Sequence, residues 1–139
     1  MRTQSTQRRV IENDPFTRQI IGFAIEVHRH LGPGLLESTY QNCLAHEFKI
    51  NGINYEAEAA LPVHYKGCEL ECGYRIDLLV ENRLILELKS VEKVSPIHKA
   101  QILTYMKLSS ISTGLLINFN VKRLVDGVER FIIYEEILL

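Results

Sequence analysis

The 139-residue sequence carries almost no net charge, because 16 lysines and arginines are balanced by 17 aspartates and glutamates. A formal net charge of −1 argues against a protein that coats nucleic acid non-specifically, although a local basic site remains compatible with it. No apolar run approaches the roughly 20 residues that a membrane-spanning helix needs. The opening MRTQSTQRR is polar and lacks the apolar stretch of a secretory signal. We therefore expect a soluble, cytoplasmic protein with no membrane partner.

Cysteines are few and odd in number, which argues against a disulfide framework. For Cys43, Cys68 and Cys72, in a chain without a signal peptide, reduced thiols are the expectation. Cys68 and Cys72, with His64 nearby, are also candidates for a zinc site. Their spacing fits no familiar paired CxxC pattern, so zinc is the minor alternative for this segment.

The composition is that of an ordinary globular protein, with 46% hydrophobic and 24% charged residues. These values argue against disorder, and the length suffices for one domain with a substantial core. We expect a flexible basic tail over residues 1–12 and a single domain over residues 13–139.

The elements follow in the order helix, helix, three strands, helix, strand, strand. Asp14-Pro15 and Ser95-Pro96 are helix starts, and the glycines of 32–34 end the first helix. Alternation predicts one strand over 55–66, at an edge or bulged because of Pro62. The remaining ranges are helices at 35–51 and 96–109, and strands in the hairpin of 73–90, at 113–120 and at 128–138. Strands that meander and then cross over through a helix predict an α/β sandwich around a mixed sheet.

The hairpin GYRIDLLVENRLILELKS, residues 73–90, contains charges among aliphatic residues. Alternate residues of a strand point to opposite faces, which predicts two apolar rows. These rows are Tyr74, Ile76, Leu78 and Val80 in one strand and Leu84, Leu86 and Leu88 in the other. Residues opposite each other share a face, so the loop length must match one apolar row with the other.

A three-residue loop at 81–83 achieves this match, because it pairs Leu78 with Leu86. It also places Asp77 opposite Glu87, so the two carboxylates are predicted to lie on one face, about 5 Å apart at their Cβ atoms. Carboxylates this close repel one another unless a cation or a proton lies between them.

Lys89 then falls opposite Arg75 and completes a charge cluster. Two interpretations stay open from the hairpin alone. One is a solvated sheet face with a Glu–Lys ion pair. The other is a site for a hard divalent cation such as Mg²⁺, which prefers carboxylate oxygens. In the second case Lys89 can orient the attacking water or stabilise a pentacovalent phosphate.

Two helices carry further candidates. His98, Gln101 and Tyr105 share one face of the helix after the hairpin, while an inward stripe is predicted at Ala100, Leu103 and Met106. That face is either the ordinary polar edge of an amphipathic helix or part of a functional site. Glu37 lies in the first turn of the second helix, where the helix dipole favours a carboxylate. His28 and His30 have no convincing metal partner in the sequence and are treated as structural.

The candidate residues follow one another in a fixed order: Asp77, a ten-residue step to Glu87-Leu88-Lys89, and then a helix with Gln101 and Tyr105. This order resembles the motif of the PD-(D/E)XK nuclease superfamily. Residues 34–40, GLLESTY, match the motif for which the GxxExxY protein family within that superfamily is named. The blocks LPVHYKG, GYRIDLLVE and GLLINFN are also similar, so the resemblance covers about residues 16–134. One departure is that an isoleucine, not a proline, precedes Asp77.

The resemblance implies a restriction-endonuclease-like αβββαβ core, with a mixed sheet flanked by helices. It also implies Mg²⁺-dependent hydrolysis of nucleic-acid phosphodiester bonds, with DNA as the favoured substrate and Mn²⁺ as a substitute metal. Carried over to this chain, Asp77 and Glu87 would hold the metal together with the carbonyl of Leu88. Glu37 would complete the acidic cluster.

The remaining roles also come from the resemblance. Lys89 would position the attacking water, and Gln101 and Tyr105 would contact the phosphate backbone or brace Lys89. The alternative is a non-catalytic module that keeps the fold and binds nucleic acid or protein in the cleft. Near-neutral charge and small size favour this alternative, because compact nucleases of this kind often need a homodimer or a partner protein to bring them to DNA.

Overall fold

The computed structural model describes residues 14–134. The tail predicted for residues 1–12 lies outside these residues, as does the end of the strand predicted for 128–138. The helices are α2 (Pro15–Leu31), α3 (Glu37–Ile50) and α4 (Pro96–Ser109). The strands of the main sheet are β1 (Tyr55–Ala60), β4 (Arg75–Val80), β5 (Leu84–Lys89), β6 (Thr113–Asn118) and β7 (Val128–Ile132). Within residues 14–134, no helix is both long and apolar enough to cross a membrane.

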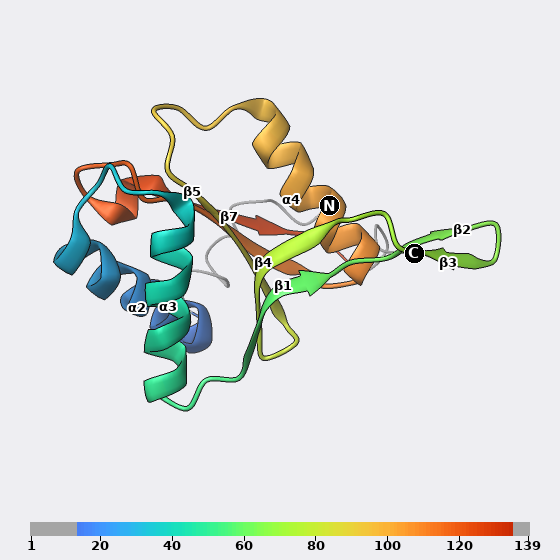
Figure 1. Cartoon of the computed structure of the whole chain (residues 1–139), viewed down its shortest axis with the longest axis horizontal. Helices are drawn as coiled ribbons and strands as arrows, with labels where there is room; N and C mark the ends of the chain where they lie inside the picture. The colour runs from blue at the N-terminus through green and yellow to red at the C-terminus, as the bar shows by residue number, and fades with distance from the viewer. Residues whose placement is uncertain (1–13, 135–139) are drawn as a thin grey trace.

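The main sheet has the strand order β1-β4-β5-β6-β7 (Figure 1). β5 and β6 are parallel because α4 carries the chain from one to the other, and the other neighbours are antiparallel. The succession α3-β1-β4-β5-α4-β6 is the predicted restriction-endonuclease-like αβββαβ core, and the mixed sheet flanked by helices is confirmed. α2 and β7 are additions to that core.

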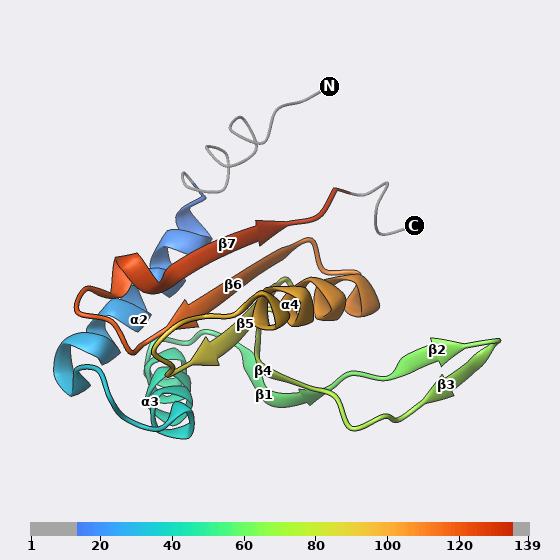
Figure 2. The ribbon, with the colours of Figure 1, turned by 90° about the horizontal axis from the view of Figure 1, so that it is seen from above.

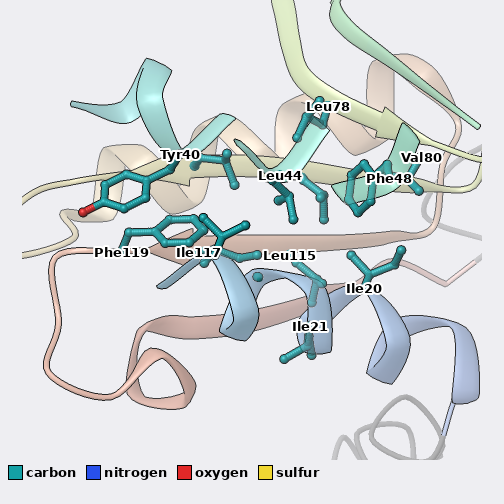
Figure 3. Close-up of a cluster of buried hydrophobic side chains, with 14 of the residues drawn as sticks. Ile20, Ile21, Tyr40, Leu44, Phe48, Leu78, Val80, Leu115, Ile117 and Phe119 are labelled. Carbon is teal, nitrogen blue, oxygen red and sulfur yellow. The ribbon is translucent and has the colours of Figure 1, made fainter. Parts of the chain in front are cut away.

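Two hydrophobic clusters hold the helices to opposite faces of the sheet. The cluster under α2 and α3 is shown in Figure 3. Its buried members include Ile20, Ala24, Tyr40, Leu44, Phe48, Leu78, Leu86, Leu115, Ile117 and Phe119. The cluster under α4 includes Ala59, Ile76, Ile85, Ile102, Tyr105, Met106 and Leu116. The middle strands are thus covered on both faces, which makes the sheet a rigid support for groups at its strand ends.

The predicted strand 55–66 is wrong in its length. β1 ends at Ala60, and Pro62, which has no N–H to donate to a ladder, lies at the break. The chain then forms a separate small hairpin of β2 (Val63–Tyr65) and β3 (Cys68–Leu70). This hairpin projects from the body of the molecule (Figure 2).

A short 3-10 helix, η1 (Leu124–Gly127), closes over the end of β6. A Cβ at Gly127 would clash with the carbonyl oxygen of Asn118, which is backbone and cannot move away easily. We expect Gly127→Ala to lower the free energy of unfolding by about 1–3 kcal/mol, the usual cost of overpacking. Urea denaturation measures this change.

Gly22→Ala is the matched control. Gly22 is exposed on α2, and a Cβ there meets no atom within 4 Å. Alanine also favours the helix over glycine by roughly 0.5–1 kcal/mol, so this variant should be as stable as wild type or slightly more stable. Equal stability of the two variants would contradict the close approach of Gly127 to the Asn118 carbonyl oxygen.

Candidate functional site

The site lies where β4 and β5 stop pairing. The loop of residues 81–83 and the predicted register are confirmed, with ladder pairs Val80–Leu84, Leu79–Ile85 and Leu78–Leu86. Beyond them, side chains replace the backbone ladder. The Asp77 N–H donates to Glu87 Oε2 at 2.9 Å, and the Leu88 N–H donates to Asp77 Oδ2 at 2.8 Å. The two carboxylates therefore lie side by side, each held by the backbone of the opposite strand.

This arrangement buries negative charge. Glu87 is only 4% exposed, and burial, followed by the negative charge of Asp77, raises its pKa to about 8. Burial also raises the pKa of Asp77, and the charges of Glu58 and Glu37 add to that rise. The positive charge of Lys89 acts in the opposite direction on both carboxyls. Each carboxylate uses one oxygen for its backbone bond, which leaves Asp77 Oδ1 and Glu87 Oε1 to bind a cation.

Glu58 is a site residue that the sequence reasoning missed. The β1–β4 ladder runs from Ala57–Leu78 to Ala59–Ile76 and omits the level of Glu58 and Asp77. Glu58 has a positive φ of 52°, an uncommon conformation for a residue other than glycine. Its Oε2 accepts a hydrogen bond of 2.9 Å from Gln41 Nε2 on α3. In the sequence it looks like one more solvent-facing residue of an alternating strand, and only the register with β4 brings it to Asp77.

The same irregularity corrects the predicted apolar row of β4. Ile76 was expected to share a face with Leu78 and Val80, but it packs in the cluster under α4, while Leu78 and Val80 pack under α2 and α3. The alternation of faces is thus interrupted at Asp77. Lys89 does not oppose Arg75 in a ladder either, because the β4–β5 ladder ends at the pair Leu78–Leu86.

Glu37 lies at the first turn of α3, beside the end of β5. Its Oε2 accepts a hydrogen bond of 3.2 Å from the N–H of Ser90, the residue that follows Lys89 in the chain. In the part of the chain that the structure describes, no group of three or more His, Cys, Asp or Glu side chains is arranged to hold a metal ion. The convergence of Glu37 with Asp77 and Glu87 on one point is therefore not present, and the site has a close pair of carboxylates with a third nearby.

Two carboxylates are nonetheless a suitable donor set for Mg²⁺, which commonly binds one or two protein carboxylates and keeps several waters. Leu88 supplies its N–H to Asp77, and the role of its carbonyl as a metal ligand stays a prediction.

Gln101 and Tyr105 lie on α4 and contact each other, with Gln101 Nε2 donating to Tyr105 Oη at 2.8 Å. Tyr105 is only 4% exposed, whereas Ala100, predicted to point inward, is exposed. The inward stripe of α4 thus contains Tyr105 together with Ile102 and Met106. Burial raises the pKa of the Tyr105 hydroxyl, and the charges of Glu87 and Asp77 contribute to that rise. Tyr105 is therefore a neutral hydroxyl within electrostatic reach of the two carboxylates.

Two of the histidines have structural contacts. His98 Nδ1 accepts a hydrogen bond of 3.2 Å from the Ser95 N–H at the start of α4. The buried His28 holds the chain after β6 through a bond of 2.8 Å between its Nε2 and the Val121 carbonyl. His30 is exposed and lies 3.3 Å from Glu26 one helical turn away.

The raised pKa of Glu87 predicts how stability depends on pH. Between its ordinary value of 4.5 and about 8, the folded protein keeps a proton that the unfolded chain releases. The free energy of unfolding of the metal-free protein should therefore fall as pH rises through this window, by at most about 1.4 kcal/mol per pH unit for one proton. Above about pH 8 the contribution should level off. Urea denaturation in EDTA at a series of pH values measures the slope.

Glu87→Gln should remove most of this slope, because the amide oxygen can still accept from Asp77 but carries no titrating proton. Glu92→Gln, at an exposed position after β5, is the control and should keep the slope. A wild-type stability that is flat between pH 5 and pH 8 would contradict the elevated pKa.

A sequence profile of the PD-(D/E)XK nuclease superfamily matches residues 14–131, which include the αβββαβ core and the charged hairpin. A search among curated proteins gave no match. Membership in the narrower GxxExxY family stays a prediction. The match covers most of the chain and agrees with the observed fold, so the chain belongs to the PD-(D/E)XK nuclease superfamily.

Proposed function

We propose that this protein is a Mg²⁺-dependent nuclease that hydrolyses phosphodiester bonds of nucleic acid, with DNA as the favoured substrate. The observation that supports the proposal best is the pair of interlocked carboxylates, Asp77 and Glu87, beside Lys89. Burying two like charges is costly unless a cation or a proton offsets them. A stable hairpin needs only acceptors for these two N–H groups, which neutral side chains could supply, whereas two adjacent carboxylates also make a donor set for a hard divalent cation.

The residues take separate roles in the proposed mechanism. Asp77 Oδ1 and Glu87 Oε1 would bind Mg²⁺, for which Mn²⁺ would substitute. When bound, the cation supplies Lewis-acid polarisation of the scissile phosphate. The Lys89 ammonium orients the attacking water and stabilises the charge that develops on the pentacovalent phosphate. The Tyr105 hydroxyl, held by Gln101, is kept protonated and can donate a hydrogen bond to a phosphate oxygen.

A non-catalytic nucleic-acid- or protein-binding module is the second candidate. It is favoured by the net charge of −1 and by the lack, within residues 14–134, of a preformed group of three metal-binding side chains. Under this alternative the protein would bind nucleic acid or a partner protein, alone or as a homodimer, without cleaving DNA. Nuclease assays with Mn²⁺ on single- and double-stranded substrates separate the two candidates.

Asp77→Asn tests the metal site. The amide oxygen of asparagine can still accept from the Leu88 N–H, so the hairpin should keep its geometry. We expect affinity for Mn²⁺ to fall by at least about 100-fold, the upper range for groups that only support a ligand. The melting temperature in EDTA should stay the same or rise, because like-charge repulsion is relieved.

Calorimetric titration and thermal unfolding measure the two effects. Asp126→Asn, at an exposed position of η1, is the control and should leave both unchanged. A large loss of melting temperature with Asp77→Asn in EDTA would instead indicate a structural role for Asp77.

Lys89→Ala separates catalysis from metal binding. If Lys89 acts on the water or on the phosphate, cleavage should fall by roughly 100-fold or more, the usual scale for such a group. Affinity for Mn²⁺ should stay the same or rise, because a nearby positive charge is removed. A cleavage assay and a calorimetric titration on the same variant measure this, with exposed Lys93→Ala as the control. Unchanged cleavage with intact metal binding would remove Lys89 from the mechanism.

A further inference from the structure

The loop of residues 32–36, which joins α2 to α3, is held by one tyrosine hydroxyl. Tyr40 Oη donates to the Gly32 carbonyl at 2.6 Å and accepts from the Leu35 N–H at 3.1 Å. Tyr40 is fully buried, so these two bonds satisfy a hydroxyl that has no access to water. The same hydroxyl thus bridges the beginning and the end of the loop. Between them, Gly34 has a φ of 94°, a conformation that glycine adopts without strain.

The ring of Tyr40 connects this loop to the strand that carries Lys89. It stacks on Phe119 with ring centroids 4.4 Å apart and an angle of 11° between the planes. Figure 3 shows the two rings side by side at one end of the cluster. The Phe119 N–H donates to the Lys89 carbonyl at 2.9 Å, so Phe119 continues the pairing of β6 with β5. The tyrosine therefore packs directly on the residue that supports the end of β5.

Ser90 completes the connection from the other side. Its Oγ donates to the Leu35 carbonyl at 2.5 Å, and its N–H donates to Glu37 Oε2 at 3.2 Å. Leu35 is thus held by Tyr40 through its N–H and by Ser90 through its carbonyl. Glu37, two residues further on, points its carboxylate at the strand end because the loop is held in this position.

We propose that Tyr40 is a positioning residue for metal binding, whose hydroxyl fixes the loop of residues 32–36 and thereby keeps the Glu37 carboxylate beside Asp77 and Glu87. A negative charge held there attracts a divalent cation more strongly than the same charge on a loop that is free to move away. The inference rests on the proposed metal site but not on cleavage. It assigns the glutamate and the tyrosine of the GLLESTY segment to one device, in which the tyrosine acts through the glutamate.

Tyr40→Phe tests the inference, because it keeps the ring stacked on Phe119 and removes only the hydroxyl. Affinity for Mn²⁺, measured by calorimetry, should fall about 10-fold, the low end of the range for groups that support a metal ligand. Glu37→Gln should lower the affinity for Mn²⁺ by a similar factor. The double variant should bind Mn²⁺ no more weakly than Glu37→Gln alone, since Tyr40 acts only through Glu37.

Tyr55→Phe is the matched control. Tyr55 packs near Phe48 in the same cluster, with ring centroids 5.9 Å apart, and its hydroxyl has no hydrogen-bond partner among residues 14–134. It should bind Mn²⁺ as wild type does. A Tyr40→Phe variant with wild-type affinity, or losses from Tyr40→Phe and Glu37→Gln that add, would overturn the inference and leave the proposed metal site standing.

Amide hydrogen exchange in EDTA provides a readout without metal. Tyr40→Phe should speed exchange at the Leu35 and Ser90 amides by about 10-fold or more. The Leu35 N–H loses its acceptor, the Tyr40 hydroxyl, and the Ser90 N–H loses the fixed position of its acceptor, the Glu37 carboxylate. Unchanged exchange at both amides would overturn the positioning role directly. If wild type binds no Mn²⁺, the proposed function fails, and with it the effect of Tyr40 on the metal, whatever the exchange rates are.

Discussion

Two adjacent carboxylates, Glu87 buried and Asp77 half-buried, lie at the point where β4 and β5 separate, and the rest of the site depends on this pair. Where the backbone ladder ends, the N–H groups of Asp77 and Leu88 need acceptors, because an unpaired buried N–H is costly. Glu87 and Asp77 provide them. The same bonds that satisfy the backbone therefore force two negative charges together, and burial makes that arrangement unfavourable without a proton or a cation. Under the proposed function, the stability of the hairpin and its capacity to bind metal would have one structural origin.

The surroundings keep this pair from relaxing. β5 is buried on both faces and pairs with β6 in parallel as far as Lys89 and Asn118. Asn118 then holds the next turn of chain, since its Oδ1 accepts from the Val91 N–H and its Nδ2 donates to the Val91 carbonyl. Because strand and turn are both anchored, Glu87 cannot move away from Asp77 to relieve their repulsion, and Lys89 stays at the same strand end. A rigid strand end of this kind is what a preorganised electrostatic site requires.

Local rules predicted the parts of the structure that depend on neighbours in the sequence. The loop length and the two apolar rows were enough to pair Leu78 with Leu86, because a shift of one residue would mix apolar and charged faces. Errors occurred where distant segments decide. Glu58 reaches Asp77 only through the irregular β1–β4 ladder, and Ile76 changes face at the same level. Tyr105 looked like an outward polar residue, yet it is buried near the two carboxylates, which no helical periodicity can indicate.

The charge balance of the chain gives the metal a second role under the proposed function. With a net charge of −1 and the carboxylates of Asp77, Glu87, Glu58 and Glu37 near one another, the metal-free site would repel a phosphate backbone. Lys89 supplies one positive charge against them. A divalent cation bound at the pair would offset two of these negative charges at the point where the scissile phosphate would sit. Metal binding and the approach of nucleic acid are then linked by the same electrostatic term, so each should strengthen the other.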